Sequence, residues 1–446
     1  MTSIPTSFVR EAFPDIHPLA ERAVMDALAR VQAPAEPGAP SPWARIERVA
    51  AHNTARVLAA FQQAGASEGY LAETTGYGYS DPGRDAIEQV YASLFGAEAA
   101  LVRPQMVSGT HALAAALFGV LRPGDELVVA TGAPYDTLWP VLGLGEQPAP
   151  GSLAEWGVRT RVVALREDGS VDLAGLEAAL GAHTRAILVQ RSRGYSWRPS
   201  LSMAQIETIC GVAHAHGCIV VVDNAYGEFV EEREPGHVGA DLVAGSLIKN
   251  PGGGLAPSGG YLAGRRDLVT RAAERLVAPG LAADVGPGLG VMRWVWMGLW
   301  LAPRSVSEAL AGACVAAQAF GSWGFAVSPG AFEERYDTVQ VVRAGRPETA
   351  LAILRGVQKA SALDWRAVPT PARLPGYRDA VAMAAGTFVQ GSSSELSADL
   401  PMRPPYDVFI QGGLSRYHVA LGVARALDEL LRNGLVTPFE TSFGNP

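Results

Sequence analysis

The chain has 446 residues, of which 48% are hydrophobic, and this composition predicts a compact folded protein rather than a disordered one. Its net charge is −8, from 44 acidic and 36 basic residues spread along the chain. This balance excludes the basic surface that binding to nucleic acid or to anionic lipid requires, so a small-molecule substrate is expected.

The three cysteines are too few for a disulfide framework, and their spacing with the histidines matches no common zinc signature, so no metal is expected. The first residues lack the basic and apolar segments of a secretory signal, and we expect a cytoplasmic protein. The most apolar stretch, residues 286–303, is interrupted by Pro287, by glycines and by Arg293. It predicts a buried segment or an oligomer interface rather than a membrane span.

Three regions follow one another along the chain. Residues 1–69 are expected to form an N-terminal arm and lead-in helices, at 19–31 and 42–64. Residues 70–285 alternate helices with short apolar runs, which predicts βαβ units around a mainly parallel sheet in a large domain. The expected strands are 126–130, 161–165, 186–190, 219–223 and 241–244. Residues 286–446 have long Ala-rich helical stretches and fewer strand signals, and are expected to form a smaller C-terminal α+β domain.

A turn of small residues, Ser108-Gly109-Thr110, precedes an Ala-rich helix. The backbone N–H groups at such a helix start, with the two hydroxyl groups, can bind a phosphate dianion. The alternative is an ordinary N-capped helix. Tyr135 follows the expected strand 126–130, where it could stack on a cofactor ring, although a tyrosine there is also common in a core or at its rim.

Polar groups follow two further apolar strands. Asp223 ends the strand 219–223, while Ser246 and Lys249 follow the strand 241–244. The aspartate alone could cap the next helix. Together, an aspartate and a lysine at adjacent strand ends suit pyridoxal 5'-phosphate (PLP), because the carboxylate pairs with the ring nitrogen and the lysine binds the aldehyde as a Schiff base. Lys249 and Lys359 are the two lysines of the sequence, whereas arginine, which cannot serve as an amine nucleophile, supplies 34 basic positions.

Several longer motifs resemble the methionine gamma-lyase-like, or aluminium-resistance, family in the Cys/Met-metabolism group of PLP enzymes. The resemblance extends from about residue 70 to residue 418. Its motifs are TTGYGYSDPGRDAIE, RPQMVSGTHALAAALFGVLRPGDEL, PYDTL, QRSRGYSWRPSL, VDNAYGEFVE, GSLIKNPGGGLAPSGGY, LPGY, ELSADLPMRPPY and FIQGGL.

This resemblance implies an aspartate-aminotransferase-like α/β fold, PLP fold type I, in a homodimer or homotetramer with shared active sites. It implies catalytic roles for Lys249, Tyr135 and Asp223. The residues implied to bind the cofactor are Ser108, Gly109, Thr110, Tyr135, Asp223, Ser246, Lys249 and Tyr77. Tyr77 would reach the phosphate of the neighbouring subunit, and Tyr79 is the alternative, because the spacing does not decide between them. Tyr79 is also a candidate for binding the substrate.

Two motifs contain candidates for binding the substrate carboxylate, which a planar guanidinium holds in a fork. Arg403 lies in the C-terminal position expected from the resemblance, whereas Arg191 and Arg193 follow a core strand and could contact phosphate or substrate. Three positions depart from the family pattern: Ala225 where cysteine is usual, the segment around Met297, and the segment that introduces Arg416. A changed substrate specificity would be sought at these positions.

The implied reaction is an α,γ- or α,β-elimination or replacement on a γ-substituted, sulfur-containing L-amino acid, including a biosynthetic γ-replacement. Lys249 is the natural base for removing the Cα proton. The alternative enzyme is a PLP-dependent aminotransferase, which shares the aspartate and the lysine. A regulator without turnover is disfavoured, because residues 1–60 carry as many acidic as basic side chains.

Overall fold

The computed structural model describes residues 8–72, 74–78, 81–145 and 147–436. The chain divides into two compact units. The large unit comprises Arg48–Val306 with Pro375–Arg378, and the small unit comprises Met1–Glu47, Ser307–Leu374 and Asp379–Pro446. The domain boundaries expected after residues 69 and 285 stay predictions.

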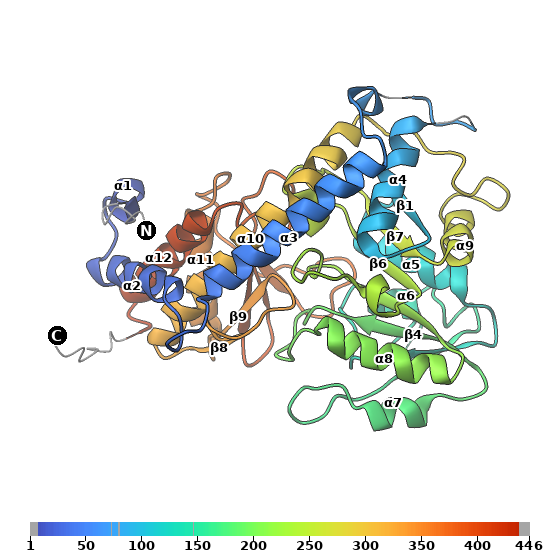
Figure 1. Cartoon of the computed structure of the whole chain (residues 1–446). Helices are drawn as coiled ribbons and strands as arrows, with labels where there is room; N and C mark the ends of the chain where they lie inside the picture. Colours follow the sequence, from blue (N-terminus) through green and yellow to red (C-terminus); the bar gives the residue numbers. More distant parts are fainter. Residues whose placement is uncertain (1–7, 73, 79–80, 146, 437–446) are drawn as a thin grey trace. The chain divides into compact units, whose positions relative to one another are not determined.

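In the described part of the large unit, seven strands form one sheet in the order β1-β7-β6-β5-β4-β2-β3. Figure 1 labels β1, β7, β6 and β4 of this sheet. Neighbouring strands from β6 to β3 are parallel, while β7 runs antiparallel to both β6 and β1. The strands are β1 (Ala99–Arg103), β2 (Glu126–Val129), β3 (Arg159–Val162), β4 (Thr184–Gln190), β5 (Ile219–Asp223), β6 (Leu242–Ser246) and β7 (Gly260–Gly264). The predicted α/β fold with a mainly parallel sheet is confirmed.

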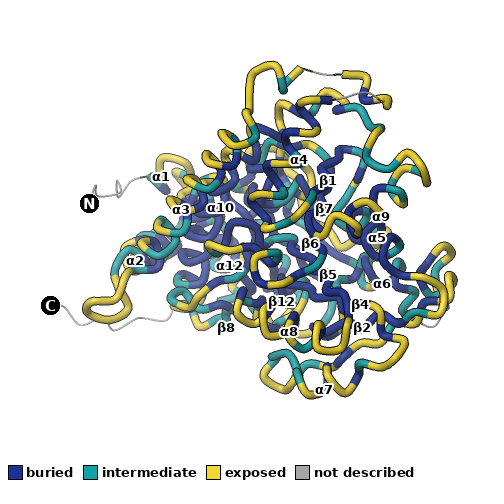
Figure 2. The backbone as a smooth tube through the Cα atoms, turned by 45° about the vertical axis from the view of Figure 1, so that its right-hand side comes forward, coloured by how far each residue is buried: buried dark blue, intermediate teal, exposed yellow. Residues whose placement is uncertain are grey.

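Helices follow most of these strands and bury their apolar sides. The central strands β4, β5 and β6 are buried except at Arg185, whereas α7 is exposed at three of its seven residues (Figure 2). One core cluster joins α5 and α9 to alternating side chains of the sheet, such as Leu127, Leu188 and Val221. The helices are α4 (Pro82–Phe95), α5 (Gly109–Val120), α6 (Leu138–Leu142), α7 (Leu173–Ala179), α8 (Met203–Ala215) and α9 (Arg266–Leu276), with 3-10 turns η1 (Glu68–Leu71), η2 (Pro235–Val238) and η3 (Asn250–Gly252).

The small unit contains an antiparallel sheet, which has the order β10-β11-β12-β9-β8 over the residues that the structure describes. Its elements are α1 (Phe8–Ala12), α2 (Pro18–Gln32), β8 (Ala326–Ser328), β9 (Val339–Arg343), α11 (Pro347–Lys359), β10 (Val381–Ala384), β11 (Ser397–Pro401), β12 (Asp407–Gln411) and α12 (Arg416–Arg432). Two longer helices, α3 (Pro42–Gln63) and α10 (Met292–Ser322), each contain one of the unit boundaries.

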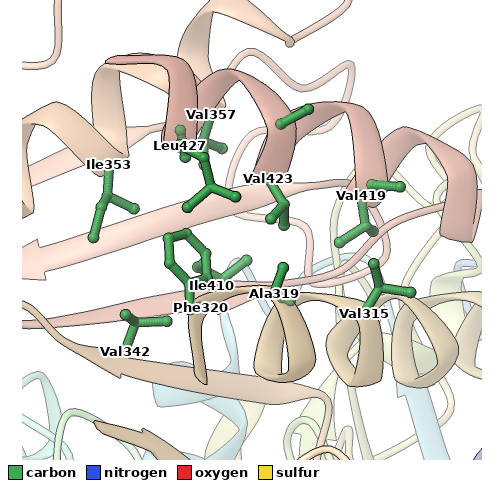
Figure 3. Close-up of a cluster of buried hydrophobic side chains, with 14 of the residues drawn as sticks. Val315, Ala319, Phe320, Val342, Ile353, Val357, Ile410, Val419, Val423 and Leu427 are labelled. Carbon is green, nitrogen blue, oxygen red and sulfur yellow. The ribbon is translucent and has the colours of Figure 1, made fainter. Parts of the chain in front are cut away.

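The core of the small unit lies between α10, α11, α12 and the sheet. Phe320 of α10 and Leu427 of α12 point into it, together with Ile410 of β12 and Ile353 of α11 (Figure 3). The helix α2 adds a row of apolar side chains at helical spacing, which pack into the same cluster. This second sheet agrees with the expected α+β character of the C-terminal part, although the sequence contained few strand signals.

The helices expected at 19–31 and 42–64 correspond to α2 and α3. Within the described residues, no helix combines the length and apolarity needed to cross a membrane.

Candidate active site

The predicted polar residues meet at the carboxyl ends of the parallel strands. Gln190, Asp223 and Ser246 are the last residues of β4, β5 and β6, three adjacent strands that run in the same direction. Lys249 lies three residues beyond β6, at the start of η3. This edge of a parallel sheet is where α/β proteins place their ligands, so the strand order brings the predicted aspartate and lysine to one site.

Asp223 is a buried carboxyl group whose negative charge is poorly compensated. Its Oδ1 accepts a hydrogen bond of 3.1 Å from the backbone N–H of Ala225, and no side chain of the described residues forms an ion pair with it. Burial raises the pKa of Asp223 from 3.8 to about 6, against the opposing effects of that hydrogen bond and of the charges of Arg198 and Lys249. A cationic ligand group beside Asp223 would therefore be favoured.

Lys249 has a close partner that the sequence reasoning did not identify. Its Nζ donates a hydrogen bond of 2.8 Å to the hydroxyl of Tyr226 and lies 4.5 Å from the centre of the Tyr226 ring. Tyr226 has a φ of 72°, which is unfavourable for a residue with a side chain and recurs at functional sites. A tyrosine three residues after the strand-end aspartate was the available signal.

The loop that carries Tyr226 is fixed by Arg191. This side chain is fully buried, and its Nη1 donates to Asn224 Oδ1 at 2.9 Å and to the carbonyl of Gly227 at 2.7 Å. Its Nη2 binds Glu231 at 2.7 Å. Arg191 thus has a structural role within the described residues, which makes it a poor candidate for the substrate carboxylate.

The start of α5 lies beside the end of β6. A Cβ atom placed on Gly109 would lie 3.3 Å from the Cβ of Ser246, so glycine permits this close approach. Ser108 is the N-cap of α5, where its Oγ accepts from the N–H of His111 at 3.1 Å, and Thr110 shares a 2.8 Å hydrogen bond with Thr137. The N-cap of the alternative interpretation is therefore present. It does not exclude an anion site, because the backbone N–H groups at the helix start can still face an anion.

Tyr135 contacts two other tyrosines. Its backbone N–H donates to Gln190 Oε1 at 2.7 Å, which fixes it to the end of β4. Its hydroxyl lies 2.7 Å from the hydroxyl of Tyr377, and its ring centre lies 5.2 Å from that of Tyr195. Tyr195 and Tyr377 are inside motifs of the family resemblance, but periodicity and spacing gave them no role.

The remaining predicted residues have different surroundings. Tyr77 is 75% exposed and forms an isolated β-bridge with Val285, while Tyr79 lies outside the described residues. Arg193 is buried in the loop after β4. Arg403 belongs to the small unit, where its Nη1 contacts Asp379 at 2.8 Å and its side chain is 35% exposed.

The three positions that depart from the family pattern differ in their surroundings. Ala225 lies in the Asp223 loop, and Met297 is exposed on α10. Arg416 is buried at the start of α12, where it forms ion pairs with Glu308 at 2.9 Å and with Glu47 at 2.6 Å. The positive charge of Arg416 is therefore already compensated by two carboxylates.

Comparisons with known proteins extend over almost the whole chain. A family model described as methionine gamma-lyase matches residues 31–431. The uncharacterized protein YnbB of Bacillus subtilis (strain 168) is 45% identical over 394 residues, which are 88% of this chain and 94% of YnbB. A carbon-sulfur lyase involved in aluminum resistance from Clostridium novyi NT has a crystal structure with a TM-score of 0.89 and 39% identity, covering 96% of this chain and all of that chain.

A more distant relative is L-methionine gamma-lyase of Pseudomonas putida. It is 33% identical over 205 residues, which are 45% of this chain and 46% of that enzyme.

Proposed function

Because this chain belongs to the methionine gamma-lyase family, whose members are PLP-dependent lyases, we propose that it eliminates or replaces the γ- or β-substituent of a sulfur-containing L-amino acid. The observation that supports this most is the position of Asp223 and Lys249 at the ends of adjacent strands, beside the start of α5.

The chemistry of these side chains fits PLP. Lys249 would bind the aldehyde, and Asp223 would bind the protonated ring nitrogen, which compensates the buried charge that raises its pKa. Ser108, Gly109, Thr110 and Ser246 would surround the phosphate, and Tyr135 would stack on the ring. When bound, PLP supplies an electron sink for negative charge that develops at the substrate Cα.

The protein side chains would hold and move the protons. The Lys249 amine removes the Cα proton, and the Tyr226 hydroxyl, 2.8 Å away, keeps that amine in place. The Tyr135 hydroxyl protonates the departing sulfur. Arg403 binds the substrate carboxylate, and to do so it exchanges the carboxylate of Asp379 for that of the substrate. Arg193 is the second candidate for this contact.

Isotope exchange tests the reaction type. In deuterium oxide, an accepted γ-substituted amino acid should exchange its Cα hydrogen and its Cβ hydrogens, and should release a thiol, or exchange it for an added nucleophile. Vinylglycine should be processed too, because it enters after the substituent has left. Proton NMR and a thiol assay measure these outcomes. An aminotransferase would instead stop after the first half-reaction, with the amino group on the cofactor, until a 2-oxo acid is added. That result, without Cβ exchange, would favour the aminotransferase over the lyase.

The proposal includes an oligomer with shared active sites, in which Tyr77 or Tyr79 contacts the phosphate of the neighbouring subunit. Its support is a set of exposed apolar side chains on the part of α10 in the large unit, because such patches commonly form protein contacts. They are Trp294, Met297, Trp300 and Leu301.

We expect the double substitution Met297→Glu and Trp300→Glu to halve the molar mass measured by light scattering and to weaken PLP binding. Introducing two charges into an apolar interface would cost several kcal/mol. Trp365→Glu is the matched control, because Trp365 is an apolar side chain of the small unit that is at least as exposed as Met297 and Trp300. A monomeric wild-type protein with full activity would contradict the shared site.

The cytoplasmic location remains a prediction. The buried free thiols of all three cysteines suit it.

A further inference from the structure

The LPGY turn carries a tyrosine directly to the candidate site. Residues Pro375–Arg378 belong to the large unit, although the residues on both sides of them belong to the small unit. Within this turn, the Tyr377 hydroxyl lies 2.7 Å from the Tyr135 hydroxyl, and the two rings meet edge to face at 5.9 Å. These tyrosines are 242 positions apart in the sequence, so the contact is a feature of the fold.

Both neighbours of Tyr377 are attached to the segment that holds Tyr135. Gly376 has a φ of 82°, and a Cβ placed on it would lie 3.5 Å from Thr137. The guanidinium of Arg378 lies 4.3 Å from the centre of the Trp139 ring, whose Nε1 donates to the carbonyl of Pro134 at 2.9 Å. The turn is therefore held against the Tyr135 segment on each side of Tyr377.

Tyr195 completes a cluster of three partly buried rings. It approaches Tyr135 at 5.2 Å and Tyr377 at 6.0 Å, from the loop that follows β4. Packing of this kind limits the side-chain rotations of Tyr135 and keeps its hydroxyl beside that of Tyr377. A hydroxyl that is held in this way is preorganised for proton transfer.

We propose that Tyr377 is a positioning residue that donates a hydrogen bond to the Tyr135 hydroxyl and so makes Tyr135 an effective proton donor to the leaving substituent. This inference rests on the proposed function. The electron pair left on the neighbouring carbon by proton removal forms a carbon–carbon double bond as the carbon–sulfur bond breaks with its own pair on sulfur. The proton of the Tyr135 hydroxyl is transferred to that sulfur. The phenolate that remains on Tyr135 accepts the hydrogen bond from Tyr377, and water returns the proton afterwards.

A titration tests the hydrogen bond without any substrate. 3-Fluorotyrosine is incorporated at position 135 of the PLP-bound enzyme, and its 19F chemical shift is followed with pH. Tyr377→Phe keeps the ring but removes the donor, so the pKa of residue 135 should rise by about one unit, a tenfold change in its ionisation constant. Tyr417→Phe, which removes a hydroxyl from an exposed tyrosine of the small unit, should leave this pKa unchanged. An equal pKa in wild type and Tyr377→Phe would refute the proposal.

The dependence on the leaving group tests the catalytic consequence. Tyr377→Phe should lower kcat/KM about tenfold for a substrate that releases an alkyl thiolate, and much less for one that releases an aryl thiolate, which needs less protonation. In Tyr135→Phe, the additional Tyr377→Phe change should have almost no effect. Equal losses for both leaving groups would overturn this role. If the wild type cleaves no carbon–sulfur bond, the proposed function fails, while the 19F titration still decides whether Tyr377 stabilises the Tyr135 phenolate.

Discussion

Replacing Lys249 with alanine should prevent covalent attachment of PLP and reduce turnover by about 10²–10⁴-fold, the usual contribution of a positioned general base. The loss should be this large because the same amine binds the cofactor and removes the Cα proton. After borohydride reduction of the wild-type protein, peptide mass spectrometry should find the cofactor on the peptide that contains Lys249. Lys359→Ala should keep both the label and the activity.

Lys359 is a suitable control because it is the second lysine of the sequence and has a separate structural role. It ends α11 in the small unit, where its Nζ forms an ion pair with Glu429 of α12, and its side chain is 47% exposed. A label on Lys359, or undiminished turnover in Lys249→Ala, would show that the assigned lysine is wrong.

The sequence predicted the strands at the centre of the large sheet better than those at its edge. The strand expected at 219–223 agrees with β5 because continuous apolar residues mark a strand that is buried on both faces. At the edge, β3 begins at Arg159 rather than at residue 161, and three of its four residues are exposed. The apolar pattern therefore carried little information about where β3 begins and ends. Neither β1 nor β7 was expected as a strand.

The sequence indicated the polar residues at strand ends but not the contacts made by distant loops. Asp223 and Lys249 follow recognisable strands, so parallel pairing alone brings them to one edge. Tyr377 approaches Tyr135 only because a turn far along the chain joins the large unit, and no local pattern reports such a contact. Arg191 is the opposite case. Its position after a core strand suggested that it contacts phosphate or substrate, whereas the structure shows its side chain hydrogen-bonded to the loop that follows β5.

Asp223→Asn should have opposite effects on the stability of the cofactor-free protein and on activity. The folded-state pKa of Asp223, about 6, is above its ordinary value of 3.8, so folding binds its proton more tightly. The wild type therefore bears the full penalty of this buried charge above pH 6, and the penalty disappears as the pH falls from 6 towards 4. Asparagine removes that penalty, which is about 3 kcal/mol at most at pH 8 for a shift of about two units.

Thermal unfolding of the cofactor-free proteins should give a higher Tm for Asp223→Asn than for wild type at pH 8, and a smaller difference at pH 5. With PLP the order should reverse, because the wild-type carboxylate then pairs with the ring nitrogen and asparagine cannot supply that charge. Activity should fall about a hundredfold or more, equivalent to roughly 2.7 kcal/mol of lost transition-state stabilisation. Asp407→Asn is the matched control, since Asp407 is also buried but is paired with Arg343 at 2.9 Å, so the same substitution should lower the Tm. If Asp223→Asn retained normal turnover, or if PLP stabilised both proteins equally, Asp223 could not be the partner of the ring nitrogen.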